Sequence, residues 1–94
     1  MHIITRKQLN IFADKHPDTI SSLIRWYKKM KKSNFATFVD LRKVFPHADQ
    51  VGELTVFNIG GNKVRLISAI HYNRQKVFIR DILTHEEYNK NKWI

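Results

Sequence analysis

The sequence contains no cysteine, which excludes disulfide bonds and thiolate metal sites. No apolar run approaches the roughly 18 residues needed to span a membrane. The first ten residues, MHIITRKQLN, lack the apolar segment of a secretory signal peptide. These absences favour a soluble cytoplasmic protein. Its 94 residues suffice for one domain, residues 1–94, with its own core.

Acidic residues are scarce. Eight Asp and Glu stand against 17 Lys and Arg, which gives a formal net charge of +9. Such a surplus predicts a polyanionic partner, with nucleic acid first, although a solvated basic surface is the plain alternative.

Metal and nucleotide motifs are also missing. The five histidines show no paired ligand spacing, and the segment HEEYN at residues 85–89 does not match the zinc motif HExxH. Gly60-Gly61-Asn62-Lys63 resembles part of a phosphate loop but lacks the full pattern, and no long helix follows it. We therefore expect neither a metal site nor a cofactor.

The first half of the chain predicts two helices, which we expect to form a hairpin over a sheet. Residues 6–16 carry a short apolar stripe, with Thr5 as a candidate cap. Residues 18–32 follow Pro17 and carry a longer stripe, which we expect to face the core. That stripe consists of Ile20, Leu23, Ile24, Tyr27 and Met30.

Four lysines end the second predicted helix, including Lys28 and Lys29. They are candidates for RNA contact. The helix dipole and the free carbonyls at a helix C-terminus explain the same cluster without any ligand. A short helix or helical turn is expected over residues 34–44, and a loop over residues 46–49.

Residues 56–88 carry most of the strand signal and predict a three-stranded antiparallel sheet. Gly60-Gly61 predicts a two-residue turn that pairs Ile59 with Asn62. Alternation then places an apolar face toward the helices and a mixed, basic face, with Lys63 and Arg65, toward a ligand. The apolar face consists of Phe57, Ile59, Val64 and Leu66.

The third predicted strand, residues 77–83, has an ambiguous register. An even-length loop puts Val77, Ile79 and Leu83 on the apolar face and Arg80 on the face of Arg65. That register points Asp81 inward, whereas an odd loop or a bulge separates the two arginines. After the strand, Thr84 and Glu87 form a capping-box pattern that starts a short helix. This helix places His85 and Tyr88 on one side.

The cationic and imidazole side chains of this region suit a phosphodiester without a metal. The set consists of Lys63, Arg65, Arg80, His85 and Tyr88. Arginine and lysine stabilise negative charge that develops on phosphate oxygens, and imidazole moves a proton near neutral pH.

Three segments resemble the HigB family of toxin–antitoxin mRNA interferases. They are VFP at residues 44–46, VFNIGGNKVRLI at residues 56–67 and VFIRDILTHEEY at residues 77–88. The resemblance extends from His2 to Tyr88 and implies an α+β, RelE-like fold with two N-terminal helices on a small antiparallel sheet and a short C-terminal helix. It also implies a ribosome-associated endoribonuclease that cleaves mRNA without metal, by attack of the ribose 2′-OH on the adjacent phosphate. The implied inhibitor is a helix-turn-helix antitoxin.

With this resemblance, we expect catalytic roles for Arg65, Arg80, His85 and Tyr88, and RNA contacts from Lys28, Lys29, Asn62 and Lys63. Glu87 is interpreted as a helix cap rather than a base, and the acid and base assignments stay open. Two other functions remain as alternatives. One is a toxin of the same fold that inhibits DNA gyrase, and the other is a non-catalytic RNA-binding module.

Overall fold

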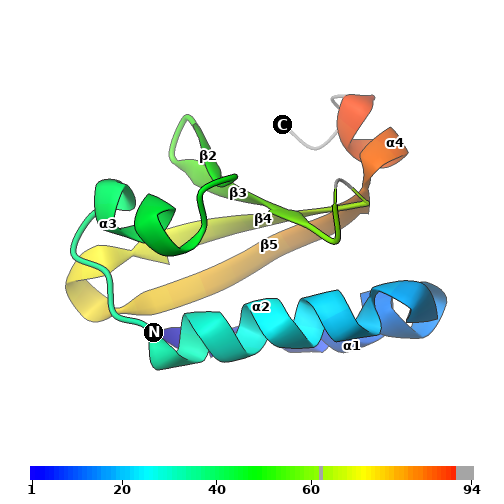
Figure 1. The fold of residues 1–94 in the computed structure, drawn as a ribbon, viewed down its shortest axis with the longest axis horizontal. Helices are drawn as coiled ribbons and strands as arrows, with labels where there is room; N and C mark the ends of the chain where they lie inside the picture. Colours follow the sequence, from blue (N-terminus) through cyan, green and yellow to red (C-terminus); the bar gives the residue numbers. More distant parts are fainter. Residues whose placement is uncertain (62, 91–94) are drawn as a thin grey trace.

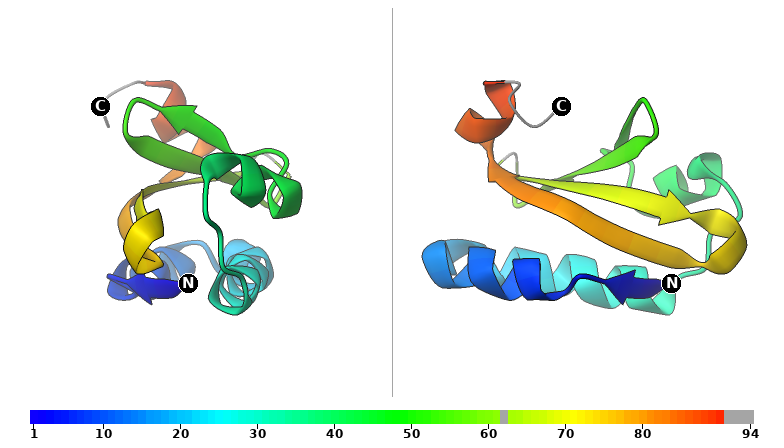
Figure 2. Two further views of the ribbon diagram at one scale, coloured as in Figure 1. Left: turned by 90° about the vertical axis from the view of Figure 1, so that its left-hand side faces the viewer. Right: turned by 180° about the vertical axis from the view of Figure 1, so that it is seen from behind.

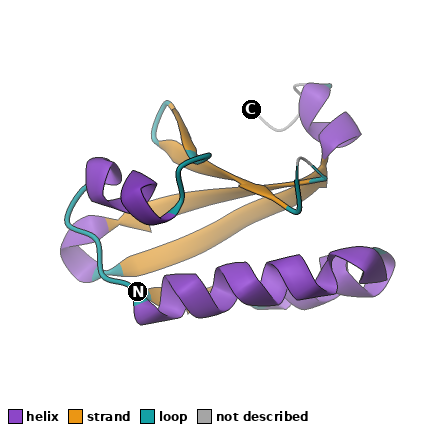
Figure 3. Ribbon diagram, in the orientation of Figure 1, coloured by secondary structure: helices purple, strands orange, loops and turns teal. Residues whose placement is uncertain are grey.

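The computed structural model describes residues 1–61 and 63–90, which form the expected α+β domain. A helical hairpin lies along one face of a twisted five-stranded sheet (Figures 1 and 3). The strands are β1 (His2–Ile4), β2 (Asp49–Val51), β3 (Leu54–Ile59), β4 (Val64–His71) and β5 (Lys76–Thr84). The α-helices are α1 (Lys7–Lys15), α2 (Ile20–Lys32), α3 (Phe38–Val44) and α4 (His85–Asn89). Two 3-10 turns, η1 (Pro17–Thr19) and η2 (Tyr72–Arg74), complete the elements. No helix within the described residues is both long enough and apolar enough to cross a membrane.

The sheet has the strand order β1-β5-β4-β3-β2, so the three predicted strands form its centre. Both edge strands have three residues and lie outside the three strands that were predicted for the sheet. β1 pairs with β5 in parallel, and β2 pairs with β3 in antiparallel orientation. Every residue of β2 is exposed, so this strand lacks the alternation by which strands are recognised.

The turn between β3 and β4 is longer than predicted. Ile59 pairs with Val64 rather than with Asn62, so residues 60–63 connect the strands. Gly60 and Gly61 both have positive φ, at 65° and 60°, as the sequence suggested. The shift is two residues, so each side chain keeps its predicted face. Phe57, Ile59, Val64 and Leu66 are all buried in the core.

A bulge in β5 determines the register of the third predicted strand, which the sequence left ambiguous. Ile67 pairs with Asp81 and Ser68 pairs with Ile79, which leaves Arg80 as the extra residue. The bulge exposes Asp81 and buries Ile82 in place of Leu83, so the even-loop register was wrong at this position. A charged residue is thereby kept out of the core, and both halves of β5 still contribute apolar side chains to it.

The helical hairpin is rotated relative to the predicted stripe. Leu23, Trp26 and Met30 of α2 are buried, and the Trp26 ring packs edge-on against Phe57 with the centroids 5.3 Å apart. Ile20 and Ile24, which the stripe placed in the core, are 39% and 48% exposed. α2 therefore has an apolar side toward the sheet and a second one toward solvent. The predicted cap at Thr5 was also wrong, because Arg6 is the N-cap of α1 and no side chain bonds there.

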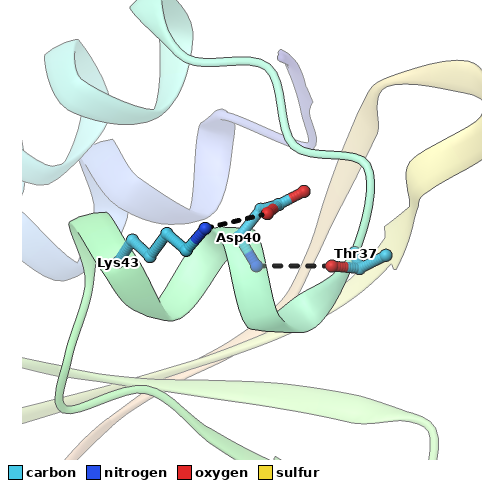
Figure 4. A network of polar contacts seen from close by, with 3 residues as sticks. All are labelled: Thr37, Asp40 and Lys43. Atoms are coloured by element: carbon cyan, nitrogen blue, oxygen red, sulfur yellow. Dashed lines mark hydrogen bonds and ion pairs between the residues drawn. The ribbon is translucent and has the colours of Figure 1, made fainter.

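α3 confirms the predicted short helix. The hydroxyl of Thr37 accepts a hydrogen bond from the Asp40 amide at 3.3 Å, and Lys43 Nζ lies 3.7 Å from the Asp40 carboxylate (Figure 4). The N-cap satisfies a free amide of the first turn, whereas the exposed ion pair adds little stability. Phe45 at the end of α3 packs on Phe57, with the ring centroids 5.1 Å apart, so this helix covers part of the same core as α2.

Candidate active site

Arg65 is the centre of a polar cluster on the sheet face opposite the α1–α2 hairpin. It lies on β4 directly across from Asn58 on β3. One guanidinium nitrogen donates to Asn58 Oδ1 at 2.9 Å and is 3.4 Å from the carbonyl of Val64. The side chain is half-buried, so these contacts fix the guanidinium while part of it stays open to solvent.

α4 begins where β5 ends and brings a histidine to Arg65. The predicted capping box is confirmed. Thr84 Oγ1 accepts from the Glu87 amide at 3.2 Å, and the Glu87 carboxylate accepts from the Thr84 amide at 2.9 Å. The His85 amide also donates to the Lys63 carbonyl at 3.1 Å, which ties the start of α4 to the β3–β4 turn. Two separate hydrogen-bond sets therefore fix the position of His85.

The His85 ring is held at both nitrogens. The second guanidinium nitrogen of Arg65 lies 3.2 Å from Nδ1, and the side-chain amide of Asn89 lies 3.2 Å from Nε2. Arginine only donates hydrogen bonds, so Nδ1 accepts and the proton of the neutral ring is on Nε2. The Asn89 atom next to Nε2 is the amide nitrogen, and turning this amide by 180° presents its oxygen to that proton. The exposed Nε2–H is consequently the proton donor that this arrangement offers to a ligand.

Tyr88 completes the cluster one turn along α4. Its ring lies beneath the Arg65 guanidinium, with Cζ 5.5 Å from the ring centroid, a cation–π distance. Arg65 thus contacts Asn58 of β3 and both His85 and Tyr88 of α4.

The Glu87 carboxylate is engaged in the capping-box hydrogen bond with the Thr84 amide. Its pKa is lowered below the ordinary value, chiefly by the hydrogen bond from the Thr84 backbone. This agrees with its interpretation as a cap rather than a catalytic base.

The structure brings together three of the four predicted catalytic residues, Arg65, His85 and Tyr88. Arg80 lies apart from them, because Arg65 pairs with Leu83, which is three residues further along β5. At about 3.3 Å per strand residue, the two positions differ by roughly 10 Å along the strand. Arg80 is exposed at the bulge.

Among the predicted RNA contacts, Lys63 lies nearest to the cluster. Besides the bond from its carbonyl to His85, it lines a hollow of about 260 Å³ together with His85 and His16. Asn62 falls outside the described residues.

Lys28 and Lys29 lie on α2, in the helical layer on the opposite side of the sheet (Figures 1 and 2). They therefore do not join the Arg65 cluster. Carbonyls at the end of α2 already accept from the amino group of Met1, which lies 3.1 Å from the Met30 oxygen. Both lysines are exposed.

Sequence reasoning missed two members of the cluster, Asn58 and Asn89. The alternation of β3 puts Asn58 on the face opposite to that of Phe57 and Ile59, and its position across from Arg65 follows once Ile59 pairs with Val64. Asn89 is four residues after His85, a spacing that places two side chains together on a helix. The sequence therefore contained both positional signals. Neither residue was selected as a candidate, because neutral amides are common on protein surfaces. The described residues contain no group of three or more His, Cys, Asp or Glu arranged to hold a metal ion.

Comparison with known proteins connects the sequence of this chain to one family. Residues 19–91 match the model of the HigB toxin family, described as the RelE-like toxic component of a toxin–antitoxin system. The chain is 36% identical over 92 residues to the mRNA interferase toxin HigB of Escherichia coli K12, covering 95% of this chain and 88% of that protein. The same identity and coverage hold for the mRNA interferase HigB of Shigella flexneri. An mRNA interferase HigB from Escherichia coli O6:H1 is 31% identical over 93 residues, covering 96% of this chain and 90% of the relative.

Proposed function

This chain belongs to the HigB family of toxin–antitoxin toxins, and from that premise we propose that it is a cytoplasmic endoribonuclease that cleaves mRNA on the ribosome without a metal ion. The relatives named mRNA interferase support the substrate. The observation that carries the proposal is the contact of Arg65 with both His85 and Tyr88. This contact supports the proposal because it brings together a guanidinium, an imidazole and an aromatic ring, the side chains that the proposed reaction would use. Residues 1–94 would act as a single domain.

The proposed reaction is an attack of the ribose 2′-oxygen on the adjacent phosphorus. The 2′-O–P bond forms, the P–O5′ bond breaks, and the products are a 2′,3′-cyclic phosphate and a free 5′-hydroxyl. Arg65 would stabilise the negative charge that develops on the phosphorane oxygens. The Nε2–H of His85 would donate a proton to the leaving O5′ after the substrate displaces Asn89. Solvent water would accept the proton released from the 2′-OH.

Other cations would position the RNA. Tyr88 offers a face on which a base can stack. Lys63 would contact a phosphate beside the cluster, and Arg80 would bind a neighbouring phosphate from the bulge. Asn62, which precedes Lys63 in the sequence, would also contact RNA. Lys28 and Lys29 would contact ribosomal RNA on the helical side.

The proposed protein partner is a helix-turn-helix antitoxin encoded by the adjacent gene. The family description implies an antitoxin, and the net charge of +9 favours an acidic binding surface through electrostatic steering.

The test is primer extension on a translated mRNA with purified toxin and ribosomes, in parallel with naked mRNA. The expected result is cleavage within the message on ribosomes, with cyclic phosphate ends. Metal independence is tested separately by single-turnover cleavage on pre-assembled, programmed ribosomes in Mg²⁺ buffer supplemented with a chelator selective for transition metals. Growth arrest with intact mRNA and reduced gyrase activity would replace this proposal with gyrase inhibition. RNA binding without any cleavage would leave only a binding module.

A further inference from the structure

An apolar groove runs between α1 and α2 on the side of the hairpin away from the sheet. We call it the hairpin groove. It has a volume of about 580 Å³, and its apolar lining consists of Leu9, Ala13, Ile20, Leu23, Ile24 and Tyr27. Ile20 and Ile24 are one helical turn apart, and they remain 39% and 48% exposed. Neighbouring, exposed isoleucines in a concave surface are typical of a site that binds another protein.

The groove is bordered by positive charge. Arg6 and Lys31 approach the ring of Tyr27, with Arg6 Cζ at 4.7 Å and Lys31 Nζ at 5.9 Å from its centroid. Lys28 also lines the groove, whereas the carboxylate lining it belongs to Asp14. An apolar floor with a cationic border is complementary to a helix that has an apolar stripe and acidic flanks.

We propose that the hairpin groove is the docking site for an acidic amphipathic helix of the antitoxin. This inference rests on the antitoxin partner of the proposed function. The lining from Ile20 to Lys31 spans eleven residue steps of α2, or roughly 17 Å at 1.5 Å per residue. About three turns of a partner helix fit this length, with apolar anchors spaced i, i+4 and i+7.

The location of the groove makes its function separable from catalysis. The groove is lined by residues of α1 and α2, which lie on one side of the sheet, whereas α4, the helix that carries His85 and Tyr88, lies on the other side (Figure 2). A helix docked in the groove therefore leaves Arg65, His85 and Tyr88 uncovered. Substitutions of Ile20 and Ile24 are therefore expected to change antitoxin affinity without changing the cleavage rate of the free toxin.

The experiment uses the full-length toxin and the helix-turn-helix protein encoded by the adjacent gene, with the Kd measured by calorimetry. Ile20→Glu and Ile24→Glu are each expected to weaken binding at least about 30-fold, because each places a carboxylate in an apolar anchor site facing an acidic helix. The matched control is Val39→Glu on α3, where the valine is 68% exposed and distant from the groove in sequence. Its Kd should equal that of the unmodified toxin. In cells, the Ile24→Glu toxin should arrest growth even when the antitoxin is co-expressed.

Charge substitutions test the chemistry of the partner in both directions. Lys31→Glu should weaken the complex, and Asp14→Lys should tighten it, each by up to about 5-fold at low ionic strength. Both effects should shrink as salt is added. Hydrogen exchange in the complex should slow in α1 and α2, and it should not slow at the start of α4.

Several results would overturn the assignment of the groove. Unchanged antitoxin affinity of Ile20→Glu and Ile24→Glu, with normal binding by the unmodified toxin, would place the antitoxin elsewhere and leave the proposed function standing. Loss of ribosomal cleavage with intact antitoxin binding would assign the groove to the ribosome. A toxin dimer that Ile24→Glu dissociates, with antitoxin affinity unchanged, would assign it to a second copy. An adjacent-gene protein that does not bind the unmodified toxin would overturn both this inference and the antitoxin partner, while mRNA cleavage would still be judged by primer extension.

Discussion

The guanidinium of Arg65 lies 3.2 Å from Nδ1 of His85, and this contact joins the central strand β4 to the terminal helix α4. The two side chains are twenty residues apart in the sequence. Because Arg65 donates to Nδ1, the guanidinium sets the tautomer of the ring as well as its orientation. The proposed phosphate-binding group therefore also positions the proposed proton donor.

This coupling predicts strongly non-additive kinetics. His85→Ala should reduce single-turnover cleavage on programmed ribosomes by roughly 10²–10⁴. Arg65→Ala should raise the barrier by about 2–4 kcal/mol, or roughly 30- to 1000-fold in rate. The double variant should be little worse than the more damaged single variant, because the residues act as a unit. Arg65→Lys should recover only part of the rate, because lysine lacks the planar fork of donors. Near-wild-type rates for folded His85→Ala would move the active site away from this cluster.

Arg80 should behave differently from Arg65. The bulge places it roughly 10 Å along the strand from the cluster, so we expect it to hold RNA rather than the reacting phosphate. Arg80→Ala should raise KM and leave kcat within about tenfold of the unmodified toxin, the pattern of lost uniform binding. Steady-state cleavage of a model mRNA distinguishes the two arginines. A kcat loss equal to that of Arg65→Ala would instead place Arg80 at the reacting phosphate.

The capping box should make part of the stability depend on pH. The pKa of Glu87 is lowered in the folded state, so its charged form contributes stability that is fully present above the unfolded pKa. That contribution is lost as the pH falls through the lower, folded pKa. Thr84→Ala should lower stability by about 1 kcal/mol at pH 7. Thermal melts of Glu87→Gln and the unmodified protein should differ at pH 7 and converge in acid. A constant difference across this range would show that the Glu87 charge contributes nothing to the cap.

Two adjacent residues of α2 test the rotation of the hairpin. Leu23 is 4% exposed and Ile24 is 48% exposed. Leu23→Ala should lower the free energy of unfolding by about 2–5 kcal/mol, because it opens a cavity in the core. Ile24→Ala should change it by about 0.5 kcal/mol, as at other exposed positions. Urea unfolding of both variants provides the comparison. Equal losses of unfolding free energy would show that both residues face the core, as the stripe predicted from the sequence required.

Local signals in the sequence were sufficient to predict several elements of the structure. Thr84 and Glu87 specify the start of α4 through hydrogen bonds among four consecutive residues, and the structure contains that capping box. Gly60 and Gly61 specify a turn because both adopt positive φ. The alternation of β3 and β4 fixed which side chains face the core, since a two-residue change of register preserves the face of every residue. His85 and Tyr88 were placed on one side of α4 by helical periodicity alone.

Tertiary structure decided what local signals leave open. The apolar residues of α2 fill two faces of the helix, and only packing against the sheet determined that Trp26, which contacts Phe57, enters the core while Ile20 and Ile24 stay exposed. The bulge at Arg80 arises because β5 must bury Ile82 and expose Asp81 against a fixed β4, a conflict that the strand cannot resolve by itself. Strand β2 exists because β3 offers an unpaired edge, since its own residues are all exposed. The sequence thus determined the residue types of the candidate site and the helix that carries His85. The pairing of β3, β4 and β5 decided that Arg65, and not Arg80, contacts that histidine, because strand register depends on packing across the whole sheet.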